Sequence, residues 1–251
     1  MIETDFQRRE FANSEALAQG LADWTAGRLR DAIAARGVAL LIVSGGKSPA
    51  RFFDLLSNLD LEWSRVTITL ADERRVADDS PRSNARLVRE RLLQNRAERA
   101  SFTPLADVRL PPDQELAAAS ARIASLPMPA DVVILGMGDD GHTASWFPDA
   151  AGLAEAMDPG ARKLVAPIVA PDAPEPRLTL TGRVLLRANA IALEIQGAGK
   201  LATFSRALEA GPEHAMPIRA VLRGAADRLT VFMSLSADAP SAATAETRPS
   251  A

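Results

Sequence analysis

The sequence predicts an α/β fold with a mostly parallel central sheet and helices on both of its faces. Short apolar segments alternate with stretches of helical periodicity along most of the chain, which is the pattern of repeated βαβ units. Several of these segments lack a polar face, as expected of strands that are covered on both sides. Glycine-rich turns follow three of them, and in open parallel sheets ligands bind beyond the carboxyl ends of the strands.

The expected strands are short apolar runs rich in β-branched residues and bounded by turn residues. They are Val38–Val43, Val66–Leu70, Asp131–Leu135, Leu164–Val169, Ala190–Gln196 and Leu229–Met233. The expected helices have apolar residues at helical spacing. They are Ser14–Arg36, Pro49–Ser57, Asn84–Gln94, Asp113–Ser125 and Lys200–Glu209.

No internal repeat or linker divides the chain before its last fifteen residues. Residues 237–251 are small and polar, contain two prolines and lack any large apolar side chain, so they are predicted to form a disordered tail. We therefore expect a single α/β domain over residues 1–236.

The composition excludes several classes of function. The 251 residues include 29 Lys and Arg against 32 Asp and Glu, and nucleic-acid or acidic-membrane binders usually carry a basic excess. Without cysteine there is no disulfide, thiolate nucleophile or cysteine-ligated metal, and His142 and His214 are too few for a histidine-rich metal site. No signal peptide or long apolar segment is present. These observations predict a cytoplasmic protein with no metal and no nucleic-acid or membrane partner.

The first glycine-rich turn, SGGKSP at residues 44–49, follows the strand that ends at Val43. Gly45 and Gly46 let the backbone approach a ligand closely, Ser48 can cap the next helix, and Pro49 suits its first turn. Free N–H groups at a helix start beside Lys47 favour a bound phosphate. A tight turn with a solvated lysine is an equally good interpretation of this loop alone.

Four charged residues follow the strand that ends at Leu70. Arg74 can bind a phosphate through its planar guanidinium, and Asp72 can orient that arginine or hold a sugar hydroxyl. For Glu73 and Arg75 we expect ordinary ion pairs instead.

The third turn, GMGDDGHT at residues 136–143, matches the G-x-G-x-x-G pattern of dinucleotide-binding proteins. The context does not fit, because Pro148 interrupts any long helix and no second strand follows before Leu164. A turn that presents Asp140 and His142 to the pocket is the better interpretation, since histidine suits a general base near neutral pH and a carboxylate can orient it.

Lys200 follows the glycines of GAGK at residues 197–200 and adds a second cation at a strand end, which favours an anionic substrate. Arg177 in PRLTLT can reach the same rim or be structural. Lys163 precedes a strand and is expected at the surface.

Together these motifs resemble the 6-phosphogluconolactonase family, in the right order from about Leu40 to Met233. The resemblance is carried by SGGKSP (44–49), LADERRV (70–76), DSPRSNARL (79–87), LGMGDDGHTASWFP (135–148), PRLTLTG (176–182) and GAGK (197–200). Lys47 stands where many members of that family have Ser or Thr.

The resemblance implies hydrolysis of 6-phosphoglucono-1,5-lactone to 6-phosphogluconate in the oxidative pentose phosphate pathway, without a cofactor. It implies His142 as general base, with Asp140 orienting it or the substrate. The residues implied to bind the phosphorylated substrate are Ser44, Gly45, Gly46, Lys47, Ser48, Asp72, Arg74, Thr143, Arg177 and Lys200. The oligomeric state is left open between a monomer and a small homo-oligomer.

Two alternatives remain at this stage. Glucosamine-6-phosphate deaminases share the looser pattern, but they follow the DGH residues with a carboxylate, and residues 143–148 (TASWFP) contain none. The second alternative is a non-catalytic sugar-phosphate sensor on the same scaffold.

Overall fold

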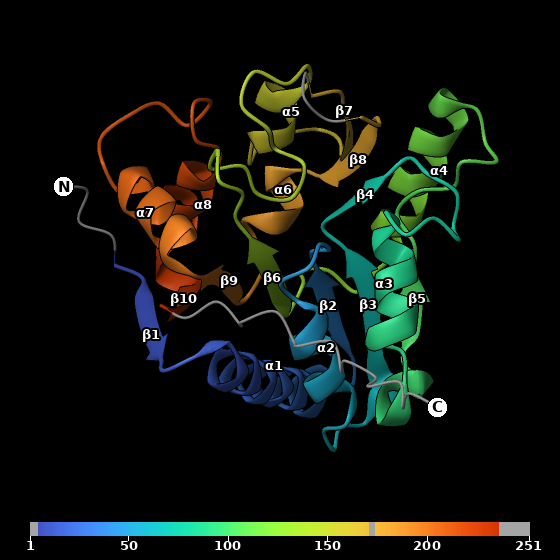
Figure 1. The fold of residues 1–251 in the computed structure, drawn as a ribbon. Helices are drawn as coiled ribbons and strands as arrows, with labels where there is room; N and C mark the ends of the chain where they lie inside the picture. Colours follow the sequence, from blue (N-terminus) through green and yellow to red (C-terminus); the bar gives the residue numbers. More distant parts are fainter. Residues whose placement is uncertain (1–4, 171–173, 236–251) are drawn as a thin grey trace, which may run out of the picture.

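The computed structural model describes residues 5–170 and 174–235, and the predicted tail over residues 237–251 lies outside them. A seven-stranded parallel sheet is central, with strand order β1-β10-β9-β6-β2-β3-β5 (Figure 1). Its strands are β1 (Gln7–Phe11), β2 (Ala39–Val43), β3 (Val66–Leu70), β5 (Ser101–Thr103), β6 (Val132–Gly136), β9 (Ile191–Gln196) and β10 (Leu229–Ser234). The predicted α/β class with a mostly parallel sheet is confirmed.

A second, three-stranded antiparallel sheet lies beyond the carboxyl ends of the parallel strands (Figure 1). It consists of β4 (Asp72–Arg74), β8 (Arg177–Leu180) and β7 (Val165–Ile168). The strand predicted at Leu164–Val169 is β7, so it does not belong to the central sheet as the βαβ pattern suggested. The charged run after Leu70 is not a loop, because the chain continues after Ala71 from β3 into β4.

Helices flank the central sheet. They are α1 (Ser14–Arg36), α2 (Ala50–Ser57), α3 (Asn84–Arg91), α4 (Pro112–Ala124), α5 (Leu153–Met157), α6 (Gly182–Leu185), α7 (Ala198–Ala207) and α8 (Ile218–Gly224). Crossovers between parallel strands are right-handed, so helices on connections that run in opposite directions along the sheet cover opposite faces. The path from β1 through β2 and β3 to β5 therefore places α1, α2 and α3 on one face, and the return through β6 and β9 to β10 places α4, α7 and α8 on the other.

The longest predicted helix matches α1 at both ends, for local reasons. The side chain of Asn13 accepts a hydrogen bond from Ala16 N at 2.9 Å, which caps the first turn. Gly37 has φ = 80°, a left-handed conformation that ends the helix at little cost.

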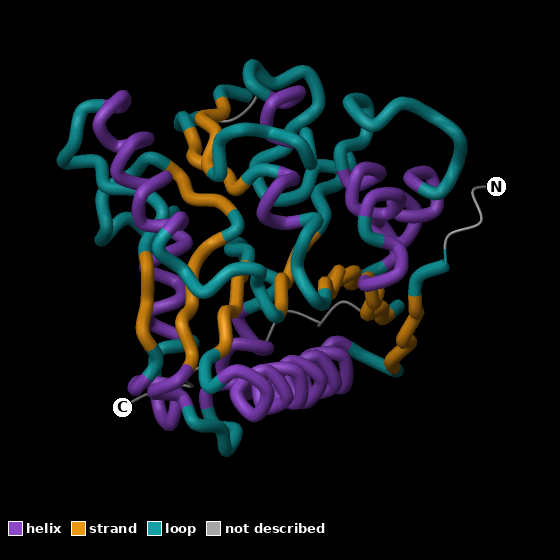
Figure 2. Tube along the Cα trace, turned by 180° about the vertical axis from the view of Figure 1, so that it is seen from behind, coloured by secondary structure: helices purple, strands orange, loops and turns teal. Residues whose placement is uncertain are grey.

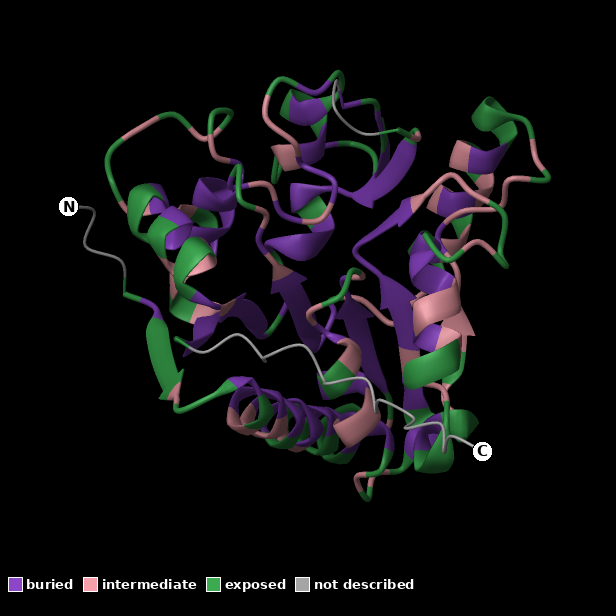
Figure 3. Cartoon of the chain, in the orientation of Figure 1, coloured by how far each residue is buried: buried purple, intermediate pink, exposed green. Residues whose placement is uncertain are grey.

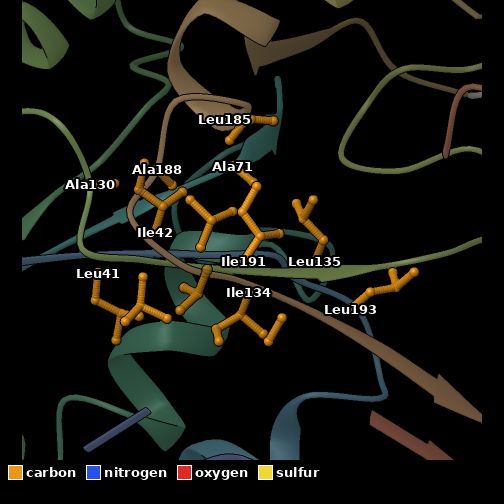
Figure 4. Packing of buried hydrophobic residues seen from close by; sticks show 14 of the residues in the cluster. Leu41, Ile42, Ala71, Ala130, Ile134, Leu135, Leu185, Ala188, Ile191 and Leu193 are labelled. Atoms are coloured by element: carbon orange, nitrogen blue, oxygen red, sulfur yellow. The ribbon is translucent and has the colours of Figure 1, made fainter. Parts of the chain in front are cut away.

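The core lies between the central strands and the helices, and the buried residues in Figure 3 follow the same strands. Figure 4 shows Ile42 of β2 and Ile191 of β9 on one face of the sheet and Ile134 of β6 on the other, so apolar side chains pack against both faces. All five residues of β2 are buried, as predicted for a strand covered on both sides. Within the described residues no helix has both the length and the apolar character to cross a membrane.

The direction of the chain reverses between β2 and β6: the connection after β2 leaves toward β3, and the connection after β6 leaves toward β9. Loops gather at this end of the sheet, as Figure 2 shows. In open α/β sheets the loops that diverge at such a switch point leave a crevice between them, where ligands bind.

Candidate functional site

A pocket of about 250 Å³ occupies this switch point. The loops after β2 and β6 line it, together with side chains from β4, β8, β9, α3 and α7. Ten of the predicted site residues line the pocket: Ser44, Gly45, Gly46, Lys47, Ser48, Asp72, Arg74, His142, Arg177 and Lys200. Asp140 and Thr143 do not line it, although both belong to the loop that carries His142.

The loop after β2 comes close to the start of α3. A Cβ on Gly45 would lie 1.9 Å from Asn84 Oδ1, so only glycine fits without a shift of one of them. Gly46 has φ = 97°, which also favours glycine. The prediction that Ser48 caps the next helix is wrong, because α2 begins at Ala50 with no side-chain cap. The Ser48 hydroxyl instead accepts a hydrogen bond from Lys200 Nζ at 3.2 Å.

Asp72 and Arg74 project from β4 into the pocket, and Asp72 also anchors its neighbours. Its Oδ2 atom accepts a hydrogen bond from the hydroxyl of Ser145 at 2.6 Å and lies 3.8 Å from Arg177 Nη1. Arg74 Nη1 donates to the carbonyl of Arg82 at 2.6 Å, while its buried Nε has no partner in the described structure. Asp72 thus ties the His142 loop and one arginine to the same strand.

Glu73, which lies between Asp72 and Arg74 in the sequence, is buried and caps the start of α3. Its carboxylate accepts hydrogen bonds from the backbone N–H groups of Arg74 (2.7 Å), Asn84 (2.8 Å) and Ala85 (2.7 Å), and from the hydroxyl of Ser83 (3.2 Å). Burial raises the pKa of Glu73, although these backbone bonds act in the opposite direction. The expected ion pair is present for Arg75, which contacts Glu115 at 2.7 Å, whereas Glu73 caps α3 instead.

The His142 loop holds its imidazole through contacts within a few residues. His142 Nδ1 lies 2.6 Å from Asp140 Oδ1, which also accepts the backbone N–H of His142 at 3.0 Å. Partial burial acts to raise the pKa of Asp140, but these two bonds outweigh it and the pKa is lowered. When Nδ1–H donates to the carboxylate, Nε2 is the free basic nitrogen.

Three further contacts hold the His142 loop in place. The ring of Phe147 contacts the His142 ring, at 4.3 Å between centroids, and also the guanidinium of Arg177, whose Cζ is 5.0 Å from the Phe147 centroid. Thr143, predicted to bind substrate, is buried and donates to the carbonyl of Gly136 at 2.8 Å.

The pocket carries an excess of positive charge. Lys47 is exposed at its rim, and Lys200 enters from the first turn of α7 after Gly197 (φ = 85°). Burial lowers the pKa of Arg177, and the charge of Arg74 acts in the same direction. Such an arrangement suits an anionic ligand that replaces the lost solvation of these cations.

Other predicted residues lie outside the pocket. Lys163 is at the surface, as expected, and pairs with Glu155 at 3.1 Å. His214 is exposed in the loop before α8. Among the described residues, no group of three or more His, Asp or Glu side chains is arranged to hold a metal ion.

Three pocket residues with polar side chains were not among the predicted site residues. Asn84 was taken only as the start of a helix; its amide donates to the carbonyl of Asp72 at 2.8 Å, and its buried Oδ1 has no partner in the described structure. Asp139 also lines the pocket. Glu194 does so too, and an acidic residue within an apolar strand was a signal that could have identified it.

The chain is similar to known proteins over most of its length. Residues 12–231 match the family model described as glucosamine-6-phosphate isomerases/6-phosphogluconolactonase. A 6-phosphogluconolactonase of Rhizobium meliloti is 49% identical over 222 residues, which cover 88% of this chain and 96% of the relative. One from Pseudomonas aeruginosa is 48% identical over 206 residues, covering 82% and 87%.

Solved structures show the same fold. A 6-phosphogluconolactonase from Shewanella baltica superposes with a TM-score of 0.87 at 43% identity, covering 92% of this chain and 98% of the other. A monomeric glucosamine-6-phosphate deaminase shares the fold at 20% identity and a TM-score of 0.74, covering 91% and 97%. With the family model matching most of its length, the chain belongs to the family of glucosamine-6-phosphate isomerases and 6-phosphogluconolactonases.

Proposed function

We propose that this protein hydrolyses 6-phospho-D-glucono-1,5-lactone to 6-phospho-D-gluconate, the second step of the oxidative pentose phosphate pathway. The observation that carries the proposal is the Asp140–His142 pair at the edge of a pocket lined by four cationic side chains, Lys47, Arg74, Arg177 and Lys200. The names of the relatives, at up to 49% identity, support the same substrate.

His142 acts as the general base in this mechanism. Its Nε2 atom takes a proton from water as the water oxygen attacks the lactone carbonyl at C1, and Asp140 holds the ring and stabilises the imidazolium that forms. The tetrahedral intermediate collapses by breaking the bond from C1 to the ring oxygen, which receives the proton from His142. A lactone is an activated ester, so an oriented base and water suffice without a cofactor.

The cationic side chains bind the phosphate and hold C1 near His142. Lys200 comes from the first turn of α7, and the backbone N–H groups of Gly45 and Gly46 come from the loop after β2, which the Lys200–Ser48 contact joins to α7. Arg177 comes from β8 and contacts Asp72 and Phe147. We also propose that the protein acts in the cytoplasm, as a monomer or small homo-oligomer and without a nucleic-acid partner.

The deciding experiment measures hydrolysis of freshly generated 6-phosphogluconolactone, with spontaneous hydrolysis subtracted. His142→Ala should lower kcat/KM by about 10²–10⁴, the usual contribution of a general base. His214→Ala is the matched control and should retain wild-type activity, because this exposed histidine lies outside the pocket. Equal activity of both variants would contradict the role of His142.

The same preparation separates the alternatives. Ammonia release from glucosamine 6-phosphate without lactone hydrolysis would establish a deaminase. Phosphosugar binding without turnover would establish a sensor. Lys200→Met should raise KM for the phosphorylated lactone and leave kcat nearly unchanged, and equal hydrolysis of unphosphorylated gluconolactone by the wild type would contradict the phosphate subsite.

A further inference from the structure

A buried carboxyl lines the pocket from β9, and the mechanism above gives it no role. Only 2% of the surface of Glu194 is exposed. Its neighbours in the sheet are Gly136 of β6 and Phe232 of β10, neither of which can pair with a charge. Burying an ionised carboxylate among apolar strands is costly, so this side chain needs a compensating interaction.

The compensation inside the protein is small. Gln196 Nε2 donates a hydrogen bond to Oε1 of Glu194, and no other hydrogen bond reaches this carboxyl from the described residues. The positive charge of Lys200 on α7 acts on Glu194, but the two side chains form no hydrogen bond, and Lys200 Nζ donates to the hydroxyl of Ser48 instead. The charged and titratable groups that share the pocket are Lys47, Asp72, Arg74, Asp139, His142, Arg177 and Lys200. The second carboxyl oxygen is thus available to a ligand.

An ionised Glu194 would oppose a phosphate in this pocket. A sugar phosphate is a dianion above its second pKa of about 6. Beside it, a carboxylate would repel the dianion and reduce the effect of Lys200. A protonated carboxyl would instead donate a hydrogen bond to a phosphate oxygen, and O–H donors to anionic oxygens form strong bonds.

The pKa of Glu194 is compatible with protonation of this carboxyl when a phosphate binds. Burial raises its pKa to about 7, while the bond from Gln196 and the charge of Lys200 act in the opposite direction. The carboxyl therefore changes charge close to neutral pH, and an adjacent dianion favours its protonated form further.

We propose that Glu194 is the proton-holding residue of the phosphate subsite: when the phosphorylated substrate binds, Glu194 takes up one proton from solvent and donates it in a hydrogen bond to the phosphate. The proposal rests on the proposed function, which places a phosphorylated ligand in this pocket. The ionised carboxylate, one solvent proton and the phosphate dianion combine in the complex, and no bond of the ligand is made or broken. Glu194 is thus a specificity residue for the phosphate end of the substrate.

The test is calorimetric titration of the full chain with 6-phosphogluconate at pH 8.0, in two buffers with different ionisation enthalpies. The wild type should take up about one proton per ligand bound, and Glu194→Gln, which keeps the shape of the side chain, should take up almost none. Glu73→Gln is the matched control: Glu73 is also a buried carboxyl with a raised pKa, but it lies outside the pocket, so uptake should persist. Equal uptake by wild type and Glu194→Gln would overturn the proposal.

A second measurement needs only the wild type and decides the question even if a variant does not fold. Between pH 7.5 and 8.5 the phosphate is fully ionised, so proton uptake predicts a Kd for 6-phosphogluconate that rises up to about tenfold per pH unit. A Kd that stays constant over this interval refutes the role of Glu194. The lactonase assay separates the two proposals, because absent hydrolysis contradicts the proposed function, whereas normal hydrolysis with pH-independent binding contradicts only the inference on Glu194.

Discussion

Gly138 leaves room for the imidazole of His142 because it has no side chain, and replacing it tests the proposed role of that histidine. A Cβ added at Gly138 would lie 2.2 Å from both Cε1 and Nδ1 of His142, and 2.7 Å from Oδ1 of Asp140. Gly138 is not among the glycines with positive φ, so its backbone accepts alanine. Gly138→Ala should therefore leave the fold intact and displace the imidazole.

The size of the displacement follows from the contact distances. Ordinary contact begins at 3.4 Å, so the ring must move by about 1.2 Å to accommodate the methyl group. A misplacement of about 1 Å in a catalytic group can cost about 10² in rate. We expect kcat/KM for 6-phosphogluconolactone to fall about 100-fold, mainly through kcat, because the cations proposed to bind the phosphate are not displaced.

The assay compares lactone hydrolysis and melting temperature for Gly138→Ala and Gly27→Ala. Gly27 lies in α1, where an added Cβ meets no atom within 4 Å, so this control should keep full activity and gain up to about 1 kcal/mol of stability. Wild-type kcat/KM in a folded Gly138→Ala variant would refute the argument that the position of His142 governs the rate.

Three further predictions follow from single side chains. Asp140→Asn should lower kcat by up to about 10⁴, because the amide can stabilise the wrong tautomer of His142; steady-state kinetics at saturating lactone measures this, and unchanged kcat contradicts it. Glu73→Ala should reduce the free energy of unfolding by about 2–4 kcal/mol, because the buried N–H groups that cap α3 lose their acceptor; urea denaturation showing a loss below about 0.5 kcal/mol would argue against this cap. Glu194→Gln should leave stability unchanged below pH 4.5, and its advantage should grow as pH rises to about 7, because the pKa of Glu194 is raised on folding and ionisation then favours the unfolded chain. At about 1.36 kcal/mol per pH unit, the interval from 4.5 to about 7 gives Glu194→Gln a stability advantage of roughly 3 kcal/mol, and equal stability of both proteins at pH 8 would disprove this prediction.

The central strands and the long helices were predictable because their pattern is dictated by burial. β3 and α1 match the predicted ranges at both ends, and β2, β6 and β9 differ by one residue at one or both ends. The strands that were missed do not depend on an apolar run of their own. β1 is an edge strand with the exposed sequence QRRE, held by its backbone bonds to β10, and β5 has only three residues. The short helices α5, α6 and α8 were missed as well, since so few residues show little periodicity.

The contacts of the site likewise divide into those that a local sequence pattern predicts and those that depend on the tertiary structure. The Asp140–His142 contact joins residues two positions apart within a glycine turn, so the sequence by itself determined that pair. Lys47 and Lys200 each follow glycines in the sequence, so a local pattern also predicted these two cationic positions. Only the tertiary structure brought Lys200 to Ser48, across 152 residues, and Ser145 to Asp72, across 73. Contacts between distant residues depend on the strand order and on the reversal of chain direction between β2 and β6, and no local sequence pattern encodes either of them. For this reason only the tertiary structure shows that Asn84, Glu194 and Arg177 line one pocket.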